Sequence, residues 1–244
     1  MANTRTITFL GLLAQGTAVV ISILLAFAIQ AWWDDRQERE EERQILEVLA
    51  TDLRKGIEVI EFGLEYHTAK QDSALHLIEA SEGLTQADPA QIESWLCDLN
   101  WDWGSKFESP AFETLLGGGL SQVQDPRLRF QIARLEESRR YTTATAENDR
   151  QTKRERLFPY FQRMGYVNHG CARPGGGSVG EVLTPLPVRI ARDHTALLND
   201  PEFVSLATFT YWDQWDGLNF LPVARQTMQE VLEAVEAELE GISR

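Results

Sequence analysis

The sequence predicts an all-α protein, in which an N-terminal transmembrane helix continues into an extramembrane antiparallel helical bundle. Residues Ile7 to Trp33 are 27 consecutive positions without a charged side chain. Behind them the apolar residues recur with the 3.6-residue period of an α-helix. No segment shows the alternation of a β-strand or an Asn-Gly hairpin turn. We therefore expect a transmembrane anchor over residues 1–33 and a helical bundle over 34–244.

The apolar run is long enough to cross a bilayer. At about 1.5 Å per residue it extends roughly 40 Å, against a hydrocarbon core of about 30 Å. Trp32 and Trp33 stand where a membrane-interface pair would, and the charged stretch Asp34 to Arg43 cannot follow them into lipid. Ala26-Phe27-Ala28 has the small-x-small form of a signal cleavage site. The run is longer than the 7 to 15 residues of a signal core, which favours an uncleaved anchor.

Two interpretations of the flanking charges disagree about the side of the membrane. The three arginines after the span outnumber Arg5, which by the positive-inside rule puts the body in the cytoplasm. Those arginines lie among six acids in ten residues, and pairs such as Asp35 with Arg39 have the i,i+4 spacing that compensates charge. The six-residue tail carries no acid. We favour the tail inside and the body outside, and the cytoplasmic alternative stays open.

The first body helix is predicted to continue the span without a break to about Ser81, with Gly83 as its end signal. Its apolar positions are spaced 3, 4, 4, 3 and 4 apart, which averages 3.6 and indicates a globular helical core rather than a coiled coil. These positions are Leu46, Leu49, Leu53, Ile57, Ile60 and Leu64.

Four later helices begin with one signal, a capping side chain followed by proline at the first helical position. The first two are short, ending near Leu96 and at Leu116. The third is long and ends near Leu157, before Pro159. The fourth reaches about Leu239, with room for a bend at Gly217 and Pro222. The four signals are Asp88-Pro89, Ser109-Pro110, Asp125-Pro126 and Asp200-Pro201.

An irregular excursion is predicted over residues 165–187, which hold six glycines and three prolines.

The charged residues of the body are distributed unevenly along the sequence. Residues 34–82 carry 14 acids and 6 bases, 202–244 carry 8 acids and 2 bases, and 127–156 between them carry 9 bases and 5 acids. These blocks are either three solvated faces or a basic helix packed between two acidic ones. The net charge of −14 argues against nucleic acid as a partner.

No catalytic, cofactor or metal site is predicted. Asp98, Asn100 and Asp102 have the alternate spacing of a calcium loop, but Trp103 and Ser109 stand where that loop requires glycine and a bidentate acid. A polar loop is the simpler interpretation. The four histidines have no metal-ligand spacing, and no nucleophile-base pattern stands out. We expect a protein that is not an enzyme and binds no cofactor.

A line of small residues marks one face of the span. Alanine or serine recurs every four residues, which permits close packing against another membrane helix, although alanine is also simply common in spans. The predicted helix-packing interface is Ala14, Ala18, Ser22, Ala26 and Gln30.

Aromatic residues are frequent in the body and have two interpretations. They are core residues, or exposed ones that form a partner-binding or membrane-contacting patch. The candidate patch is Trp95, Trp101, Trp103, Trp212 and Trp215.

The two cysteines, Cys97 and Cys171, are too few for a disulfide framework. In an oxidising compartment they would form one bridge, and in the cytoplasm they would be two buried thiols.

Three segments together resemble an uncharacterised bacterial family of single-span membrane proteins. They are LLAFAIQAWWDD at 24–35, AFETLLG at 111–117 and LNDPEF at 198–203. The resemblance covers most of the chain outside the excursion and implies the topology and the fold. With the orientation favoured above, we expect the anchor in the bacterial inner membrane and the body in the periplasm. The resemblance implies no chemistry.

Two functions remain open. The preferred one is a single-pass accessory or structural subunit that packs against and stabilises a larger membrane complex, such as a respiratory or photosynthetic one, or a second copy of itself. The alternative is a membrane-anchored module that binds or senses a ligand in a pocket of its helical bundle.

Overall fold

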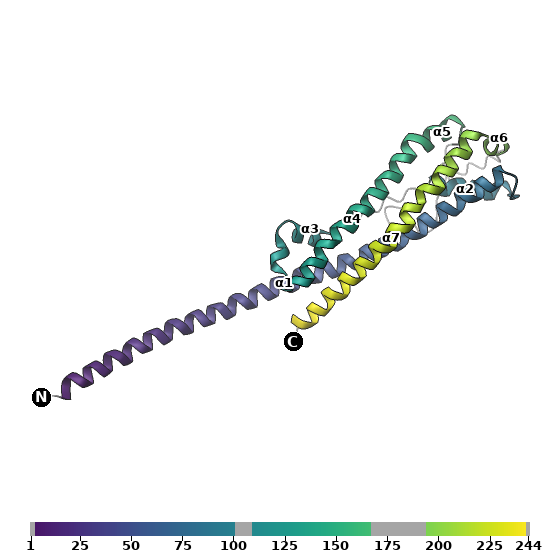
Figure 1. The fold of residues 1–244 in the computed structure, drawn as a ribbon. Helices are drawn as coiled ribbons and strands as arrows, with labels where there is room; N and C mark the ends of the chain where they lie inside the picture. The colour runs from purple at the N-terminus through teal and green to yellow at the C-terminus, as the bar shows by residue number, and fades with distance from the viewer. Residues whose placement is uncertain (1–2, 101–108, 167–193, 243–244) are drawn as a thin grey trace, which may run out of the picture.

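The computed structural model describes residues 3–100, 109–166 and 194–242, with side chains from residue 16 onward. These residues are almost entirely helical, and none of them is in a β-strand, which confirms the predicted fold class (Figure 1). The elements are α1 (Asn3–Ser81), α2 (Pro89–Asn100), α3 (Pro110–Leu116), the short 3₁₀ helix η1 (Gly119–Gln122), α4 (Pro126–Thr152), the π-helical turn η2 (Lys153–Leu157), α5 (Phe158–Arg163), α6 (Thr195–Leu198) and α7 (Pro201–Ile242).

Helix α1 passes from the apolar segment into the bundle without interruption, as predicted. Its charged stretch is held helical by pairs one turn apart, including Arg39 with Asp35 at 3.1 Å and Arg43 with Glu40 at 2.6 Å. Residues 34–41 are all exposed, and Glu42 is the first buried residue of the chain's described part. The bundle therefore begins at Glu42, nine residues beyond Trp33.

All four predicted proline starts are the observed starts of α2, α3, α4 and α7. Ser109 shows how such a cap ties a helix to the bundle. Its hydroxyl accepts a hydrogen bond from the backbone N–H of Phe112 at 3.1 Å and donates one to Asp52 of α1 at 2.7 Å. The same side chain thus begins α3 and fixes it against α1.

Two predicted helix ends are wrong. Helix α2 continues past Leu96 to Asn100, so Asp98 and Asn100 lie in a helix rather than in a polar loop. Pro159 does not end the long helix either, because the π turn η2 precedes it: the N–H of Phe158 bonds the carbonyl of Lys153, five residues back. Pro159 then falls in the first turn of α5, where a missing N–H is tolerated.

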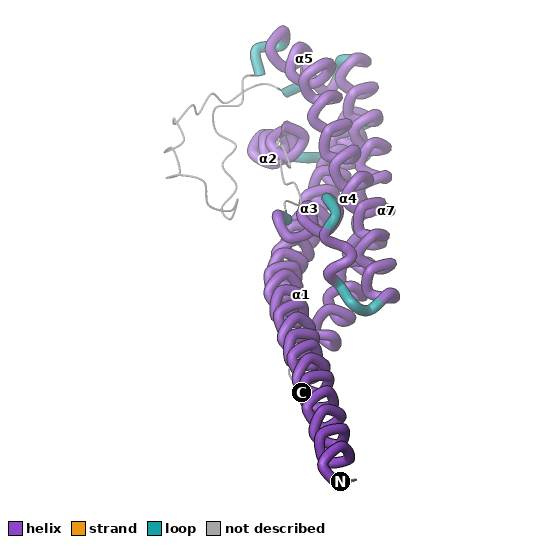
Figure 2. Tube along the Cα trace, turned by 90° about the vertical axis from the view of Figure 1, so that its left-hand side faces the viewer, coloured by secondary structure: helices purple, strands orange, loops and turns teal. Residues whose placement is uncertain are grey.

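The long helices form an elongated bundle from which the first part of α1 projects alone (Figure 1). Helices α1 and α7 run antiparallel and are each other's main neighbours, while α4 packs chiefly on α7 and α2 on α1 (Figure 2). The basic helix α4 is therefore not packed between the two acidic ones. Apolar stripes decide this arrangement, because surface charges are screened and contribute little.

Two apolar clusters fill the bundle. The proximal core, nearer the span, includes Leu46, Leu53, Ile132 and Met228, and it buries or half-buries the whole predicted stripe of α1. The distal core gathers side chains from α1, α2, α5, α6 and α7 around Leu77, Leu96, Tyr160, Phe161 and Phe203.

Candidate functional site

The predicted packing face of the span is open to its surroundings. Ala18, Ser22, Ala26 and Gln30 are all exposed, and Ala14 lies outside the side chains that the structure describes. The Ser22 hydroxyl donates to the carbonyl of Ala18 at 2.8 Å, so its lone pairs remain available as acceptors.

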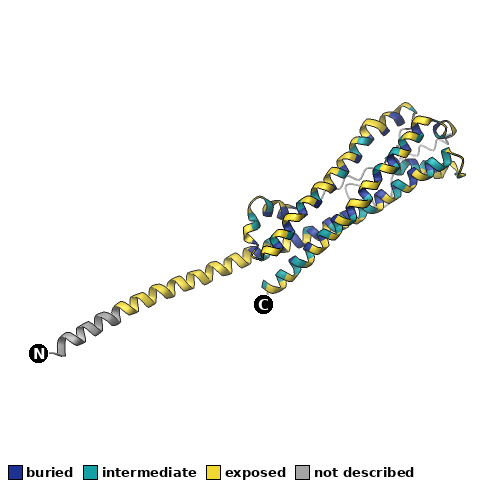
Figure 3. Ribbon diagram, viewed as in Figure 1, coloured by how far each residue is buried: buried dark blue, intermediate teal, exposed yellow. Residues whose placement is uncertain are grey.

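The large apolar side chains of the span are exposed too, with Phe27 at 66%, Trp32 at 58% and Trp33 at 61% (Figure 3). Among the described residues, one helix is long and apolar enough to cross a membrane, by length and composition.

The predicted tryptophans lie in different settings. Trp95 is half-buried against the distal core and stacks on His76, with ring centroids 4.9 Å apart. Trp212 and Trp215 lie three residues apart on α7 and are 64% and 55% exposed. Trp101 and Trp103 lie outside the described residues.

Cys97 of α2 is disulfide-bonded. Cys171 lies outside the described residues.

The most unusual feature of the bundle is a layer of buried polar side chains between its two apolar cores, which we call the polar layer. Tyr66, His67 and Lys70 come from α1, Asp149 and Lys153 from α4 and η2, and Gln214 from α7. All six are at most 3% exposed.

The centre of the polar layer is one carboxylate shared by two lysines. Lys70 Nζ lies 2.5 Å from one oxygen of Asp149, and Lys153 Nζ lies 2.9 Å from the other. Tyr66 completes the group: its hydroxyl donates to Asp149 at 3.0 Å and accepts from Lys153 at 2.7 Å. The π turn begins at Lys153, so the α-helical hydrogen-bond pattern of α4 changes at the residue that contacts both Asp149 and Tyr66.

Burial sets the protonation of these groups. It lowers the pKa of Lys70 to about 8, with the ammonium of Lys153 acting in the same direction and Asp149 against it. Burial alone would raise the pKa of Asp149, but the charges of Lys70 and Lys153 and the hydrogen bonds from both hold that pKa well below its usual range. Asp149 is therefore a carboxylate throughout the neutral range.

His67 forms the other half of the polar layer. Burial lowers its pKa, so the ring is neutral at pH 7. Its Nδ1 lies 2.7 Å from the Gln214 side-chain oxygen, which can only accept, so Nδ1 carries the proton and Nε2 is an acceptor. Gly217 of α7 makes room for this ring, since a Cβ atom there would lie 2.7 Å from it.

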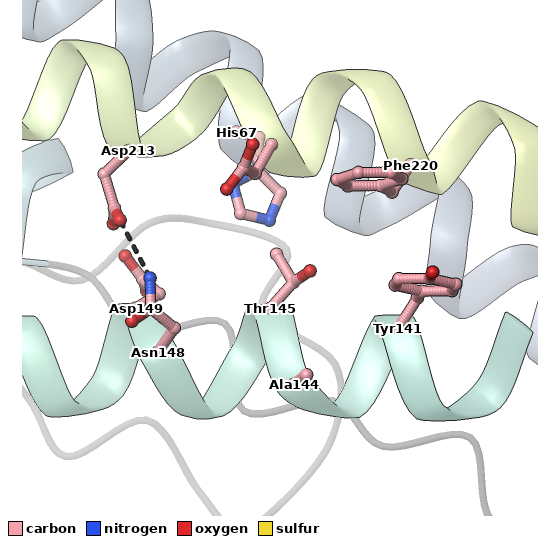
Figure 4. Close-up of a pocket in the computed structure, with 9 residues that line it drawn as sticks. His67, Tyr141, Ala144, Thr145, Asn148, Asp149, Asp213 and Phe220 are labelled. Atoms are coloured by element: carbon pink, nitrogen blue, oxygen red, sulfur yellow. Dashed lines mark hydrogen bonds between the residues drawn. The ribbon is translucent and has the colours of Figure 1, made fainter. Parts of the chain in front are cut away.

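A cleft of about 230 Å³ lies beside the polar layer, between α4 and α7 (Figure 4). The ring of His67 lies behind it, on α1. Tyr141 and Phe220 stack across one end, with centroids 5.3 Å apart and planes at 8°, and Asn148 donates to Asp213 across the other at 3.0 Å. The remaining lining residues are Ala144, Thr145, Asp149 and Asp216.

Sequence reasoning missed this layer and its cleft. A signal was present, because Lys70 continues the spacing of the α1 stripe, through Gly63, His67, Lys70, Ala74 and Leu77. A lysine at that position suggests the end of a stripe rather than a buried charge, unless its partner on another helix is known.

Comparison of the chain with protein families, with curated proteins and with solved structures finds no match.

Proposed function

We propose that the protein is a single-pass membrane accessory subunit, whose anchor packs against another integral membrane protein. The observation that carries this proposal is the fully exposed apolar segment of α1, which no other part of the described chain covers. Such a surface is covered by lipid, by protein or by both. The line of small residues from Ala18 to Ala26 favours a helix as part of the cover, because small side chains let two backbones approach closely.

The exposed, charged segment of α1 between the span and the bundle, residues 34–41, supports the same function. Eight residues, 34–41, lie between Trp33 and Glu42, and the nine steps from one to the other rise about 14 Å along the helix. The polar headgroups occupy only about 5 to 8 Å on each side of the hydrocarbon core. With the helix upright, the base of the bundle stands clear of the headgroups, leaving room for the extramembrane parts of a partner complex.

Orientation is part of the proposal. We place the anchor in a bacterial inner membrane and the bundle in the periplasm. The disulfide of Cys97 supports this side, since such bonds form and persist in oxidising compartments.

The test is co-purification of the tagged full chain in mild detergent. Ala18→Leu with Ser22→Leu fills the small-residue face and should release the partner while the protein stays in the membrane fraction. Val20→Leu with Phe27→Leu is the matched control, because at 100° per residue these positions lie about half a turn away. Equal recovery of the same partner with both double variants would refute the proposed interface.

A second candidate function, a ligand-binding module, is favoured by one specific observation. The cleft between α4 and α7 brings aromatic and carboxylate side chains together beside a buried histidine, a combination typical of small-molecule sites.

A further inference from the structure

The cleft between α4 and α7 persists because the residues along its α4 wall are small. Ala144 and Thr145 lie on α4 between the two closed ends, where a longer side chain would fill the space (Figure 4). Ala144, Tyr141 and Asp216 are exposed, so the cleft opens to solvent. Its volume of about 230 Å³ equals roughly seven or eight water molecules at about 30 Å³ each.

The strongest polar groups in the cleft are acceptors. Asp213 and Asp216 are carboxylates, which accept hydrogen bonds and donate none. No lysine or arginine lines the cleft among the described residues. A ligand that satisfies this lining must donate hydrogen bonds.

The charges at the cleft favour a ligand that is a cation. Asp149 is already neutralised by its two lysines. Within the described chain, no ion pair joins Asp213 or Asp216 to a cation, although Asp213 is half-buried. Burial, Asp149 and Asp216 raise the pKa of Asp213, and the charge of Lys70 and the hydrogen bond from Asn148 offset this only in part.

The aromatic end of the cleft is a second and independent feature, and it suits the apolar part of a small organic cation. Tyr141 and Phe220 are 49% and 41% exposed although they stack on each other. Aromatic rings attract a cation placed near their faces, and alkyl groups pack on the same surface. In the described residues no three His, Cys, Asp or Glu side chains are grouped as a metal ion requires. An organic cation therefore fits better than a metal.

We propose that the cleft binds a small organic ammonium ion, with its charged group on Asp213 and Asp216 and its apolar part against Tyr141 and Phe220. A ligand of roughly eight non-hydrogen atoms would fill the cleft. This inference depends on the cleft alone and goes beyond the accessory role, so the loss of a membrane partner would not affect it.

The test uses the full chain in detergent micelles and two probes of one shape, benzylamine and benzyl alcohol. Titration calorimetry should show saturable binding of benzylamine and at least tenfold weaker binding of the neutral alcohol. Asp213→Asn preserves the shape and should weaken benzylamine binding at least tenfold. Glu233→Gln removes an exposed acid elsewhere on α7 and should leave it unchanged.

Ala144→Leu is a second variant that fills the cleft without touching a charge, and it should also abolish binding. Circular dichroism melting shows that each variant is folded. Three results would overturn the proposal: no saturable binding of benzylamine, equal binding of the alcohol, or full binding by the folded Asp213→Asn or Ala144→Leu variant.

Discussion

Lys70 of α1 and Asp149 of α4 form a fully buried ion pair, with 2.5 Å between Nζ and Oδ1, in the middle of the bundle. Each member of the pair has the opposite charge to the net charge of its own helix, because the lysine belongs to the acidic α1 and the aspartate to the basic α4. Lys153 makes the same carboxylate the partner of a second buried cation. Asp149 is therefore the group that makes two buried positive charges tolerable.

Asp149→Asn should destabilise the bundle strongly. It leaves Lys70 and Lys153 buried without a counter-charge, which typically costs about 3–5 kcal/mol. Asp216→Asn is the control, because Asp216 is exposed, and it should change stability by no more than about 0.5 kcal/mol. Denaturant unfolding followed by circular dichroism measures both. Equal stabilities of the two variants would contradict the central role of Asp149.

Lys70 should make the protein more stable as the pH rises from 8 to 9.5. The pKa of Lys70 is about 8 in the folded state, against 10.5 as its ordinary value. Between these values the unfolded chain binds more protons than the folded one, so the free energy of unfolding rises with pH, by at most about 1.4 kcal/mol per unit. Below pH 8 both states are protonated and this gain is absent.

The measurement is the difference between wild type and Lys70→Met across that pH range. Titrating groups that do not interact with Lys70, including Tyr160, are common to both proteins and cancel. The wild type should gain stability with pH relative to the variant. Parallel pH profiles would mean that Lys70 titrates at its ordinary pKa.

The fold was largely predictable because its signals are local. Each proline start depends on a capping side chain and a proline beside it, and all four begin a helix at the predicted residue. The ends were harder. Pro159 was predicted to stop the helix, but a π turn precedes it, and Lys153 at the start of that turn donates to Tyr66, 87 positions away and outside any local window.

The polar layer was not predictable for a related reason. Lys70 and Asp149 are 79 positions apart, and they meet only because α1 and α4 have one particular register in the bundle. Nothing in either segment alone identifies the other as its partner. At Gly217 and Pro222, where a bend was predicted to be possible, α7 continues as one helix. The use of Gly217 is to admit the ring of His67.

Gly217→Ala should destabilise the protein despite the better helix propensity of alanine. The new Cβ would lie 2.7 Å from the His67 ring, which is buried and held by Gln214. Overpacking of this kind costs about 1–3 kcal/mol, against about 1 kcal/mol gained from propensity.

Gly241→Ala is the matched control, since a Cβ atom there meets nothing within 4 Å, and it should be neutral or slightly stabilising. If the clash is with His67, the double variant His67→Ala, Gly217→Ala should be more stable than the sum of the two single changes implies. Strict additivity would place the cost of Gly217→Ala elsewhere.

The disulfide of Cys97 depends on the side of the membrane on which the bundle lies. We expect its partner to be Cys171, the only other cysteine in the chain, 74 positions away. A bridge closing a loop of that length contributes about 3–4 kcal/mol in the chain-entropy model. Reductant should therefore lower the melting temperature of wild type. Cys97→Ser should melt at the same temperature as the reductant-treated wild type and should not respond to reductant.

Peptide mapping without reduction identifies the linked peptide, and protease added to intact spheroplasts should cleave the bundle if it lies in the periplasm. Protection of the bundle from protease, with both thiols found reduced in cells, would put the body in the cytoplasm instead.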